Sequence, residues 1–398
     1  MSEGASIIRV AAKGDGVTED GRHVPFSLPG DVVGVDGELI RGPHHIDPAC
    51  RHFRECGGCQ LQHADDASLG QFVRDRVFNS AQGQGVDVGQ ELPVHLSPPH
   101  ARRRATLHVL RNKGQLALGF KEAKSHRIID LQECPVLAPE LANLIDPIRT
   151  FLQTIKIKRS ADIALTLCDQ GVDCGFKQVE LDGLEMIEAA LDFSREQGLA
   201  RLSVDAGYGP DVVWEPEPVT VNLSGIAVQF PSGSFLQATL DAENTMLQDA
   251  KDWLEGSGNV VDLFSGLGAF AFGLAKGRKT LAVEADQAAH LASKSAADRT
   301  GGRVFAIHRD LFRNPLDAKE LNRFDAALLD PPRAGARQQI DQLTQSDLQR
   351  IVYISCNPSS WARDAAKLCE AGFKLAKLRP VGQFRWSTHV ELVSLFER

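Results

Sequence analysis

The sequence predicts an α/β protein organised around a doubly wound, mainly parallel sheet, preceded by a small all-β module and a mixed α+β region. Three observations predict this arrangement. The carboxyl-terminal part repeats apolar strand-like runs separated by helical stretches, whereas the amino terminus holds only short β-branched runs between turn residues. The stretch between them alternates strand-like segments with amphipathic helical ones. The predicted domains are residues 1–45, 46–222 and 223–398.

The composition of the chain limits the classes of protein to consider. With 398 residues, 43% of them hydrophobic, the chain is long enough for two or three domains. It has neither a secretory start nor an apolar run of membrane-spanning length, so we expect a cytoplasmic protein without a membrane partner, and a monomer by default. Eight cysteines are too few for a disulfide scaffold. The net charge of -8 means that any nucleic-acid surface must be local.

The amino-terminal module is predicted from two β-branched runs, Ile7 to Val10 and Val32 to Val35. Turn clusters at Lys13 to Gly16 and at Leu28 to Asp31 separate the short strands. This pattern resembles the five-stranded barrel called a TRAM domain, a fold of the oligonucleotide-binding (OB) type. The alternative is a simple capping hairpin.

The segment from Arg41 to Asp66 has little periodicity and is rich in Cys, His, Gly and Pro, which predicts a loop held by a metal centre. Four thiols suit either an iron–sulfur cluster or a tetrahedral zinc ion. Three clustered thiols with one remote thiol beside a proline fit a four-iron cluster better than the paired thiols of a zinc ribbon. The candidate ligands are Cys50, Cys56, Cys59 and Cys134.

The region that follows predicts mixed strands and helices. Ala105 to Val109, Ala161 to Leu167 and Val212 to Trp214 are strand-like, and Leu141 to Ile155 is an amphipathic helix. A local run of basic residues contains Glu122 as its only acid and predicts contact with RNA phosphates, although basic runs are often solvated faces and Arg104 and its neighbours can instead brace the catalytic domain. The run comprises Arg102, Arg103, Arg104, Arg111, Lys113, Lys121, Lys124 and Arg127.

The first strand of the carboxyl-terminal sheet ends in a glycine turn, Asp262 to Phe270, followed by a helical stretch. Such turns allow close approach of a ligand, but they also occur in dehydrogenases and in tight packing. Glu284 ends the next strand, where a carboxylate can accept hydrogen bonds from ribose hydroxyls, and Asp310 ends the strand after that. The pair also suits NAD, and either acid can be a solvated strand end.

Two further strands deliver reactive groups to the same sheet edge. Phe324 to Leu329 leads into Asp330-Pro-Pro-Arg333, a turn familiar from methyltransferases that act on amino groups, except that those continue with an aromatic residue. Ile351 to Ser355 leads into Cys356, which is either a buried apolar residue or a nucleophile. A thiolate that adds to carbon 6 of uracil makes carbon 5 nucleophilic enough to accept a methyl group.

Loss of the proton from carbon 5 requires a base. Glu391 enters the last strand-like run, and a surface charge is its alternative reading. His389 competes as the base or orients Glu391. Phe235, Phe264 and Trp386 are candidate stacking residues for a uridine taken out of its helix or loop.

Three motifs, Asp330-Pro-Pro-Arg333, Ser355-Cys-Asn-Pro358 and Thr388-His-Val-Glu391, closely resemble the signatures of the RNA 5-methyluridine methyltransferases. The resemblance covers nearly the whole chain. It implies S-adenosylmethionine as the methyl donor, Cys356 as the nucleophile and Glu391 as the general base. It places Gln237, Phe264, Glu284, Asp310 and Asp330 around the cofactor and uracil, with Gln237, Asp330 and Arg333 contacting the substrate.

The cysteine-rich segment resembles the cluster-bearing branch of this family, the 23S rRNA uracil-5 methyltransferases among them, which implies a [4Fe–4S] centre on the four candidate ligands. Two positions depart from the family pattern, Thr239 and Ala269, so their side-chain contacts are not carried over. Cys168, Cys174 and Cys369 receive no function.

The sequence therefore predicts an enzyme that methylates carbon 5 of a uridine in RNA, with ribosomal RNA favoured over transfer RNA by the family resemblance alone. A transfer-RNA uridine methyltransferase, an amino-group methyltransferase and a non-catalytic iron–sulfur RNA-binding protein are the alternatives.

Overall fold

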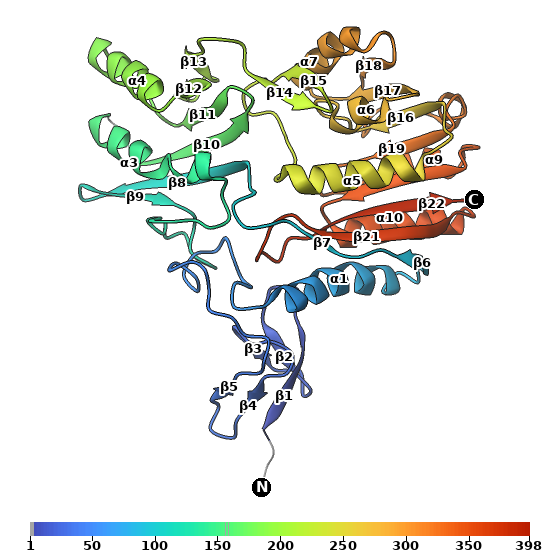
Figure 1. Cartoon of the computed structure of the whole chain (residues 1–398), viewed down its shortest axis with the longest axis horizontal. Helices are drawn as coiled ribbons and strands as arrows, with labels where there is room; N and C mark the ends of the chain where they lie inside the picture. Colours follow the sequence, from blue (N-terminus) through green and yellow to red (C-terminus); the bar gives the residue numbers. More distant parts are fainter. Residues whose placement is uncertain (1–3, 156, 158) are drawn as a thin grey trace.

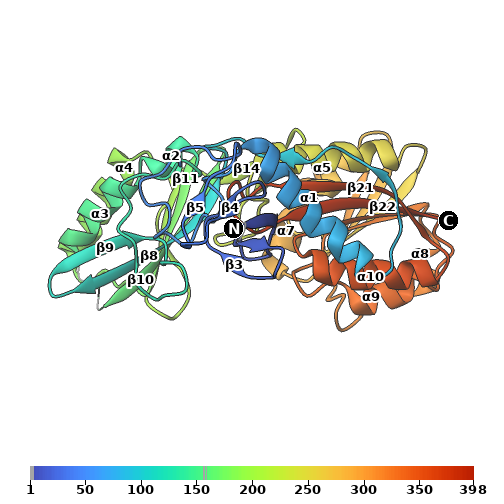
Figure 2. The same cartoon turned by 90° about the horizontal axis from the view of Figure 1, so that it is seen from below.

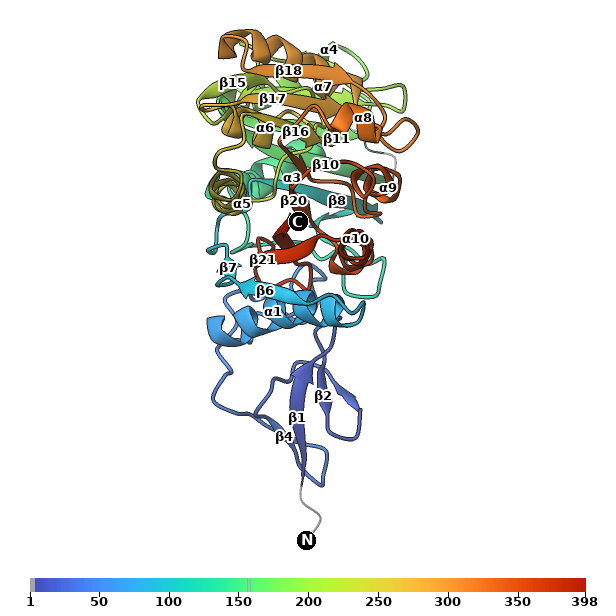
Figure 3. The same cartoon turned by 90° about the vertical axis from the view of Figure 1, so that its right-hand side faces the viewer.

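The computed structural model describes residues 4–155, 157 and 159–398. Over these residues the chain forms three main sheets and one short hairpin. Figure 1 shows the amino-terminal sheet at one end of the molecule, with the central sheet and the large carboxyl-terminal sheet side by side above it. Figure 3 shows the same stacking from the side. The α/β fold with β-rich amino-terminal parts agrees with the prediction, whereas the domain boundaries stay a prediction.

The amino-terminal sheet is antiparallel, in the order β3-β2-β1-β4-β5, as the all-β prediction requires. Its buried Asp31 carboxylate accepts hydrogen bonds from the backbone N–H groups of Leu28 and Gly42 and pairs with the His45 ring. These bonds satisfy an otherwise costly buried charge and fix the loops that close the sheet. The strands are β1 (Ala5–Val10), β2 (Gly16–Thr18), β3 (His23–Val24), β4 (Val32–Val33) and β5 (Leu39–Ile40).

The central sheet has six strands in the order β13-β12-β11-β10-β8-β9, with β11 and β12 parallel and the other pairs antiparallel. Helices α3 and α4 pack on one face, where the Phe151 and Phe193 rings stack with centroids 4.6 Å apart. The strands are β8 (Arg104–Asn112), β9 (Gln115–Gly119), β10 (Ser160–Cys168), β11 (Gly171–Lys177), β12 (Arg201–Asp205) and β13 (Asp211–Trp214).

The helix expected from Leu141 to Ile155 is two helices, α2 (Pro139–Ala142) and α3 (Ile145–Thr154), and α4 (Leu184–Glu196) follows. Pro147 explains the break. In a continuous helix its ring would clash with the carbonyl of residue 143, so the helix restarts just before the proline, where a missing N–H costs little.

The large sheet has nine strands, in the order β18-β17-β16-β19-β20-β22-β21-β6, with β7 also paired to β21. The first five in this order are parallel, and β22 runs antiparallel between β20 and β21. The strands are β6 (Val88–Glu91), β7 (His95–Leu96), β16 (Asn259–Leu263), β17 (Lys279–Glu284), β18 (Val304–His308), β19 (Ala326–Leu329), β20 (Arg350–Ser355), β21 (Lys374–Gly382) and β22 (Glu391–Glu397).

Helices cover both faces of the large sheet (Figure 2), as expected for strands that are apolar throughout. Along β16, Val261 and Leu263 belong to the core shared with α1, α9 and α10, while Val260 belongs to the core shared with α5 and α6. The hairpin β14 (Thr220–Leu223) with β15 (Ile226–Gln229) packs on α7. The helical elements are α1 (Asp66–Gln82), α5 (Leu240–Trp253), α6 (Ala269–Leu274), α7 (Gln287–Ala297), η1 (Asp298–Thr300), α8 (Ala318–Leu321), α9 (Arg337–Leu343) and α10 (Pro358–Glu370).

One part of the predicted central region joins the large sheet. Helix α1 packs against α10 and β21, and β6 and β7 add parallel strands to the far side of β21. The segment from α1 to β7 therefore contributes to the core of the large sheet, and the remaining central region follows it in the chain. Searched over the described part of the chain, no helix combines the length and apolarity needed to cross a bilayer.

Candidate active site

Sheet topology brings the predicted reactive groups to one edge. The parallel strands β16 to β20 all end there, so Asp330 follows β19 and Cys356 follows β20 at the same side. Strand β22 runs in the opposite direction, so its first residue, Glu391, lies at this edge as well. Three chemical groups that are far apart in sequence therefore share one site.

The site opens into a cleft of about 1080 Å³ between the central sheet and the large sheet. Cys356, Glu391 and Arg333 line its catalytic side, and small polar residues of the central strands, such as Thr106 and Ser203, line the opposite wall. The cleft is therefore much larger than a single base requires, and it combines a reactive end with a long polar wall.

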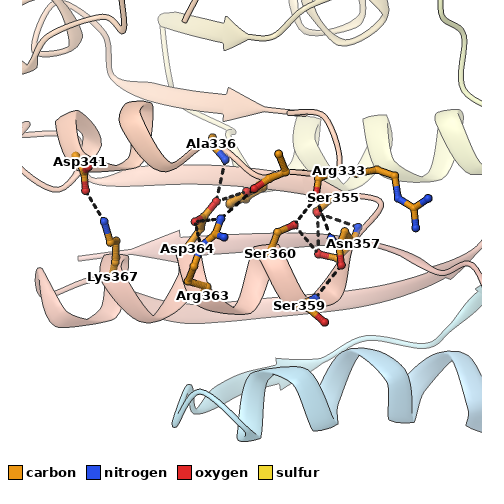
Figure 4. Close-up of polar contacts among 12 residues, drawn as sticks. Arg333, Ala336, Asp341, Ser355, Asn357, Ser359, Ser360, Arg363, Asp364 and Lys367 are labelled. Carbon is orange, nitrogen blue, oxygen red and sulfur yellow. Dashed lines mark hydrogen bonds and ion pairs between the residues drawn. The ribbon is translucent and has the colours of Figure 1, made fainter. Parts of the chain in front are cut away.

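Hydrogen bonds fix the turn that carries Cys356 to the turn that carries Asp330. The side-chain amide of Asn357 donates to the Arg333 carbonyl at 2.9 Å, and the Ser360 hydroxyl donates to the same carbonyl at 3.0 Å. Asn357 also caps α10 by accepting from the Ser359 N–H. Figure 4 shows this network and the Arg333 guanidinium pointing away from it, and that side chain lines the cleft.

The Cys356 thiol is half-buried and faces two acidic groups. Burial raises its pKa to about 11, the charges of Glu391 and Asp330 act in the same direction, and Arg333 opposes them. At neutral pH the free protein therefore holds a protonated thiol there, and nucleophilic attack requires transfer of that proton.

Glu391 is almost completely buried, and its Oε2 atom has no hydrogen-bond partner among the described residues. Burial raises its pKa to about 7, while a hydrogen bond from Gln383 and the charge of Arg104 oppose the rise. A carboxyl with this pKa can both accept and release a proton near neutral pH, as a general base must.

A chain of amides orients Asp330. Gln237 Nε2 donates to Asp330 Oδ2 at 2.8 Å, and Gln383 Nε2 donates to Gln237 Oε1 at 3.1 Å. The orientation of Gln383 is fixed in turn because its Oε1 accepts from the Ala238 N–H at 3.1 Å. Burial and the nearby charges of Glu391 and Asp262 raise the pKa of Asp330 well above its usual range.

The residues expected at a cofactor lie at the neighbouring strand ends. Glu284 follows the expected geometry at the end of β17, where it accepts hydrogen bonds from the Gly266, Ala285 and Asp286 N–H groups at 2.7 to 2.8 Å. Its Oε2 accepts one of these three bonds and so keeps a free lone pair for a hydroxyl. Phe264 adopts φ 64° in the glycine turn.

Asp310 lies beyond β18 and accepts a hydrogen bond from the Phe312 N–H at 2.9 Å. The Phe312 ring lies 5.3 Å from the Phe264 ring, so the glycine turn and the segment after β18 contribute an aromatic pair. An aromatic pair together with carboxylates that retain acceptor capacity fits an adenosine group, whose ring is apolar and whose ribose and amino group donate hydrogen bonds.

Asp262 is a functional candidate that sequence reasoning missed. It lies inside β16 beneath the glycine turn, fully buried, and neither carboxylate oxygen has a hydrogen-bond partner among the described residues. Burial raises its pKa well above its usual range. The available signal was a single acid in an otherwise apolar strand.

Seven of the eight residues of the basic run, all except Lys113, fall into two groups. Arg103 binds Glu243 at 2.6 Å and the Gln237 carbonyl at 3.0 Å, and Arg111 and Arg127 also make internal contacts, so these three brace the fold. Other members of the run line the cleft, namely Arg102, Arg104, Lys121 and Lys124.

Arg104 is the member of the basic run that faces the catalytic groups. Its guanidinium lies 4.4 Å from the centre of the exposed Phe235 ring, and its buried Nε has no partner among the described residues. Burial lowers its pKa, whereas the charges of Glu391 and Cys356 act to raise it. Trp386, a candidate stacking residue, is instead 5% exposed in the hydrophobic core, because its carbonyl is tied to residues 60 and 61.

The four predicted metal ligands line one small cavity beside the cleft, which we call the cysteine cavity. Burial is the largest cause that raises the pKa of each thiol, to about 12 for Cys59, and the other thiols add to the rise for Cys59. In residues 4–155, 157 and 159–398, no group of three or more His, Cys, Asp or Glu side chains is arranged to hold a single metal ion. The described residues therefore support neither a zinc ion nor an iron–sulfur cluster, and the metal centre stays a prediction. The cavity is lined by Cys50, Cys56, Cys59 and Cys134.

Comparisons with known proteins identify the family. The sequence profile of the tRNA (Uracil-5-)-methyltransferase family matches residues 305–398. An uncharacterised RNA methyltransferase of Zymomonas mobilis is 47% identical, over 98% of this chain and 99% of its own. The 23S rRNA (uracil(1939)-C(5))-methyltransferase RlmD of Shewanella denitrificans is 30% identical, over 94% of this chain and 90% of its own.

A solved structure shows the same fold over the whole chain. The Pyrococcus abyssi tRNA (uracil-54, C5)-methyltransferase, in complex with S-adenosyl-L-homocysteine, superposes with a TM-score of 0.78 and 22% sequence identity. The superposition covers 99% of both chains. From the shared fold and the two full-length relatives, the chain belongs to the family of S-adenosylmethionine-dependent RNA (uracil-5-)-methyltransferases.

Proposed function

We propose that this protein transfers a methyl group to carbon 5 of a uridine in RNA through a covalent adduct between Cys356 and carbon 6 of the uracil. The observation that carries the proposal is the meeting of a thiol and a buried carboxyl, Cys356 and Glu391, at one end of a long polar cleft. Family membership supplies the substrate base. The proposed roles of nucleophile and base are supported by the position of the thiol and the carboxyl at the same edge of the sheet.

The reaction divides into two halves. In the first, the Cys356 thiol gives up its proton to solvent and Sγ bonds to carbon 6, which makes carbon 5 nucleophilic. Carbon 5 then takes the methyl group that bound S-adenosylmethionine would supply, with S-adenosylhomocysteine as the leaving group. In the second, Glu391 takes the proton from carbon 5, the double bond between carbons 5 and 6 forms again, and Sγ leaves as a thiolate. The pKa of about 7 lets Glu391 accept that proton near neutral pH.

Asp330 and Gln237 are proposed to hold the uracil. The raised pKa of Asp330 keeps its carboxyl neutral, so it can donate a hydrogen bond to a uracil oxygen. Such a donor stabilises the negative charge that develops on the ring after Sγ attacks. Gln237 is held in one orientation by Gln383 and Asp330, and Arg333 adds a cation at the mouth of the cleft.

The cofactor pocket is proposed at the strand ends that carry Phe264, Glu284 and Asp310, close to Asp330. S-adenosylmethionine bound there supplies the methyl group. Glu284 accepts hydrogen bonds from the ribose hydroxyls, and Asp310 accepts one from the adenine amino group. Phe264, held at positive φ by the glycine turn, provides an apolar wall.

The RNA is proposed to lie in the long cleft, with the target base taken out of its stack so that Cys356 can reach carbon 6. The basic residues that line the cleft supply phosphate contacts. The relative that acts on 23S rRNA is similar over nearly the whole chain, so we propose ribosomal RNA as the substrate, with transfer RNA as the second candidate.

We further propose that the cysteine cavity holds a [4Fe–4S] cluster. Four thiols line one small cavity, and their burial disfavours ionisation unless a metal binds the thiolate form. Three thiols close together in sequence with one remote thiol beside a proline support a cluster of four irons over a single ion. The cluster would hold the fold of the cysteine loop.

One experiment tests the activity. The purified holoprotein is incubated with ribosomal RNA or transfer RNA that lacks uridine methylation and with methyl-labelled S-adenosylmethionine, and the labelled nucleoside is identified. We expect 5-methyluridine, and a covalent RNA–protein band on denaturing gels when the target uridine is replaced by 5-fluorouridine. Methylation of an amino group without this band would indicate the amino-group methyltransferase, and RNA binding without product the non-catalytic alternative.

A further inference from the structure

The segment that leads into the catalytic base has no helix or strand of its own. We call residues 383–390 the base loop, because it connects β21 to Glu391 at the start of β22. Trp386 within it adopts φ 61°, a conformation that bulky residues avoid unless their surroundings impose it. The position of the base loop must therefore be set by contacts with other parts of the chain.

Gln60, the residue that follows Cys59, supplies two of these contacts, beside those that Arg385 makes with Ser97 and Asp66. The backbone N–H groups of Gln60 and Leu61 donate to the Trp386 carbonyl at 2.8 and 2.9 Å. The Gln60 side chain accepts from the Thr388 N–H at 3.2 Å and donates to the Gly57 carbonyl at 2.7 Å. Gln60 thus joins the loop between Cys56 and Cys59 to the base loop by hydrogen bonds on both sides.

The amino-terminal sheet lies close to two of these residues, Gln60 and Thr388. Gly14, in the turn between β1 and β2, has φ 94°, and a Cβ atom at this position would lie 2.9 Å from Gln60 Cβ and 3.3 Å from Thr388 Cγ2. No side chain fits there. Three segments from different parts of the chain therefore meet at Gln60, namely the turn of the amino-terminal sheet, the cysteine run and the base loop.

We propose that Gln60 is a positioning residue, which couples the cysteine cavity and the amino-terminal sheet to the base loop so that Glu391 reaches the proton on carbon 5. This inference rests on the proposed function. It assigns the cysteine site and the amino-terminal module a part in the second half of the reaction. The first half, in which Cys356 bonds to carbon 6, does not use Glu391 as a base and should proceed when the base loop is displaced.

The test uses the full-length holoprotein with the variant Gln60→Ala. With natural uridine RNA, turnover should fall about tenfold to hundredfold, since a displacement of about 1 Å at a catalytic group costs that much. The covalent RNA–protein adduct should accumulate on denaturing gels, because it forms but is released slowly. Since only a step after adduct formation is slowed, the KM for RNA should fall together with kcat, and kcat/KM should change little. Cluster absorbance per protein should be retained.

Two glutamine controls separate positioning from other effects. Gln71→Ala removes an exposed amide of α1 that contacts Asp75, and turnover should not change. Gln62 lies two residues after Gln60, but its side chain accepts a hydrogen bond from the Cys50 N–H and makes none with the base loop. In Gln62→Ala the first measurable change should therefore be a loss of cluster absorbance. Adduct accumulation should appear only after that loss.

A second variant approaches Gln60 from outside the cysteine run. Gly14→Ala should displace Gln60 and Thr388 and give the same adduct accumulation. Gly21→Ala is its matched control, since Gly21 also has positive φ, lies in the same sheet and has no atom within 4 Å of the added Cβ. Both substitutions strain the backbone equally, so only the contact differs.

The outcomes are distinct. If Gln60→Ala and Gly14→Ala lower adduct formation and turnover together, Gln60 merely supports the fold and the inference is overturned. If Gly21→Ala accumulates adduct as Gly14→Ala does, strain rather than contact is responsible and the inference also fails. If the unaltered protein forms neither adduct nor 5-methyluridine with any RNA, the proposed function itself is wrong.

Discussion

Two groups of cysteines in this protein have raised pKa values for the same reason, burial, yet they face different surroundings. Cys356 lies at one end of a wide polar cleft, with Glu391, Asp330 and Arg333 as its ionisable neighbours. The thiols of the cysteine cavity face a small closed space and one another. Burial alone therefore does not distinguish a thiol that acts as a nucleophile from a thiol that binds a metal. What distinguishes them is access to a substrate and the presence of a proton acceptor.

Removing the nucleophile gives the largest expected effect. Cys356→Ala should lower methyl transfer roughly 10⁴-fold or more and abolish the covalent adduct, because no other thiol lines the catalytic end of the cleft in the described residues. Labelled methyl incorporation measures this, and cluster absorbance serves as the control for folding. Residual adduct in this variant would show that a second thiol can replace Cys356 and would break the distinction between the two groups.

Removing the proposed base, Glu391, tests further how Cys356 differs from the thiols of the cysteine cavity. Glu391→Gln should lower turnover about 10²- to 10⁴-fold, the usual contribution of a general base, while the adduct accumulates. It should also lower the pKa of Cys356, because it removes the neighbouring negative charge that raises it. Alkylation of Cys356 at pH 8 should then be faster than in the unaltered protein. An unchanged alkylation rate would contradict the proposed coupling of the two groups.

Removing one proposed metal ligand of the cysteine cavity should affect the active site around Cys356 only indirectly. Cys59→Ala should abolish cluster absorbance and lower Tm by roughly 5–10 °C, as loss of a bound metal group destabilises the folded state. Adduct formation through Cys356 should survive at temperatures where the variant is folded. Loss of the adduct in a variant that is folded by circular dichroism would mean that the two sites are one functional unit.

The titration of Glu391 predicts a pH dependence of stability. Its pKa is about 7 in the folded protein and about 4.5 when unfolded, so the folded state binds the proton more tightly. Stability contributed by this group is therefore present below pH 4.5 and is lost as pH rises to about 7, by about 3 kcal/mol in all. Glu391→Gln should be more stable than the unaltered protein at pH 8 and equal to it near pH 4.5. Chemical denaturation at the two pH values measures the difference.

The smallest effect is expected at a thiol that belongs to neither group. Cys369 is half-buried at the end of α10 and faces the apolar core instead of the cleft or the cysteine cavity. Cys369→Ser should change neither adduct formation nor cluster absorbance and should lower stability by about 1 kcal/mol. Turnover and absorbance measured side by side check both statements.

The sequence predicted the parts of the fold that follow from continuous local patterns. The runs predicted as strands at Phe324 to Leu329 and at Ile351 to Ser355 form β19 (Ala326–Leu329) and β20 (Arg350–Ser355), because each is a short run of largely apolar residues before a turn signal. Strand β6 could not be predicted in this way. Its sequence, Val-Gly-Gln-Glu, carries no strand pattern, and pairing with β21 makes it a strand.

The residues of the site divide in the same way, into those that a local sequence pattern predicts and those that only tertiary contacts reveal. Asp330 and Cys356 could be placed at one edge because each follows an apolar strand of a parallel sheet. Gln60 could not, since its partner Thr388 lies 328 residues away and the bond depends on how three segments pack. Gln383 likewise acquires its role only through its contact with Gln237. Contacts between distant segments leave no local signal.

The early position of β6 and β7 in the chain has a consequence for synthesis. These strands and α1 leave the ribosome long before β21 and α10, their partners in the finished sheet. Until the last segments appear, the apolar face of α1, which includes Phe72 and Val77, has no surface to cover it. Such faces are prone to aggregate in incomplete chains. The nascent protein should therefore depend on a chaperone that shields α1 until its carboxyl terminus is complete.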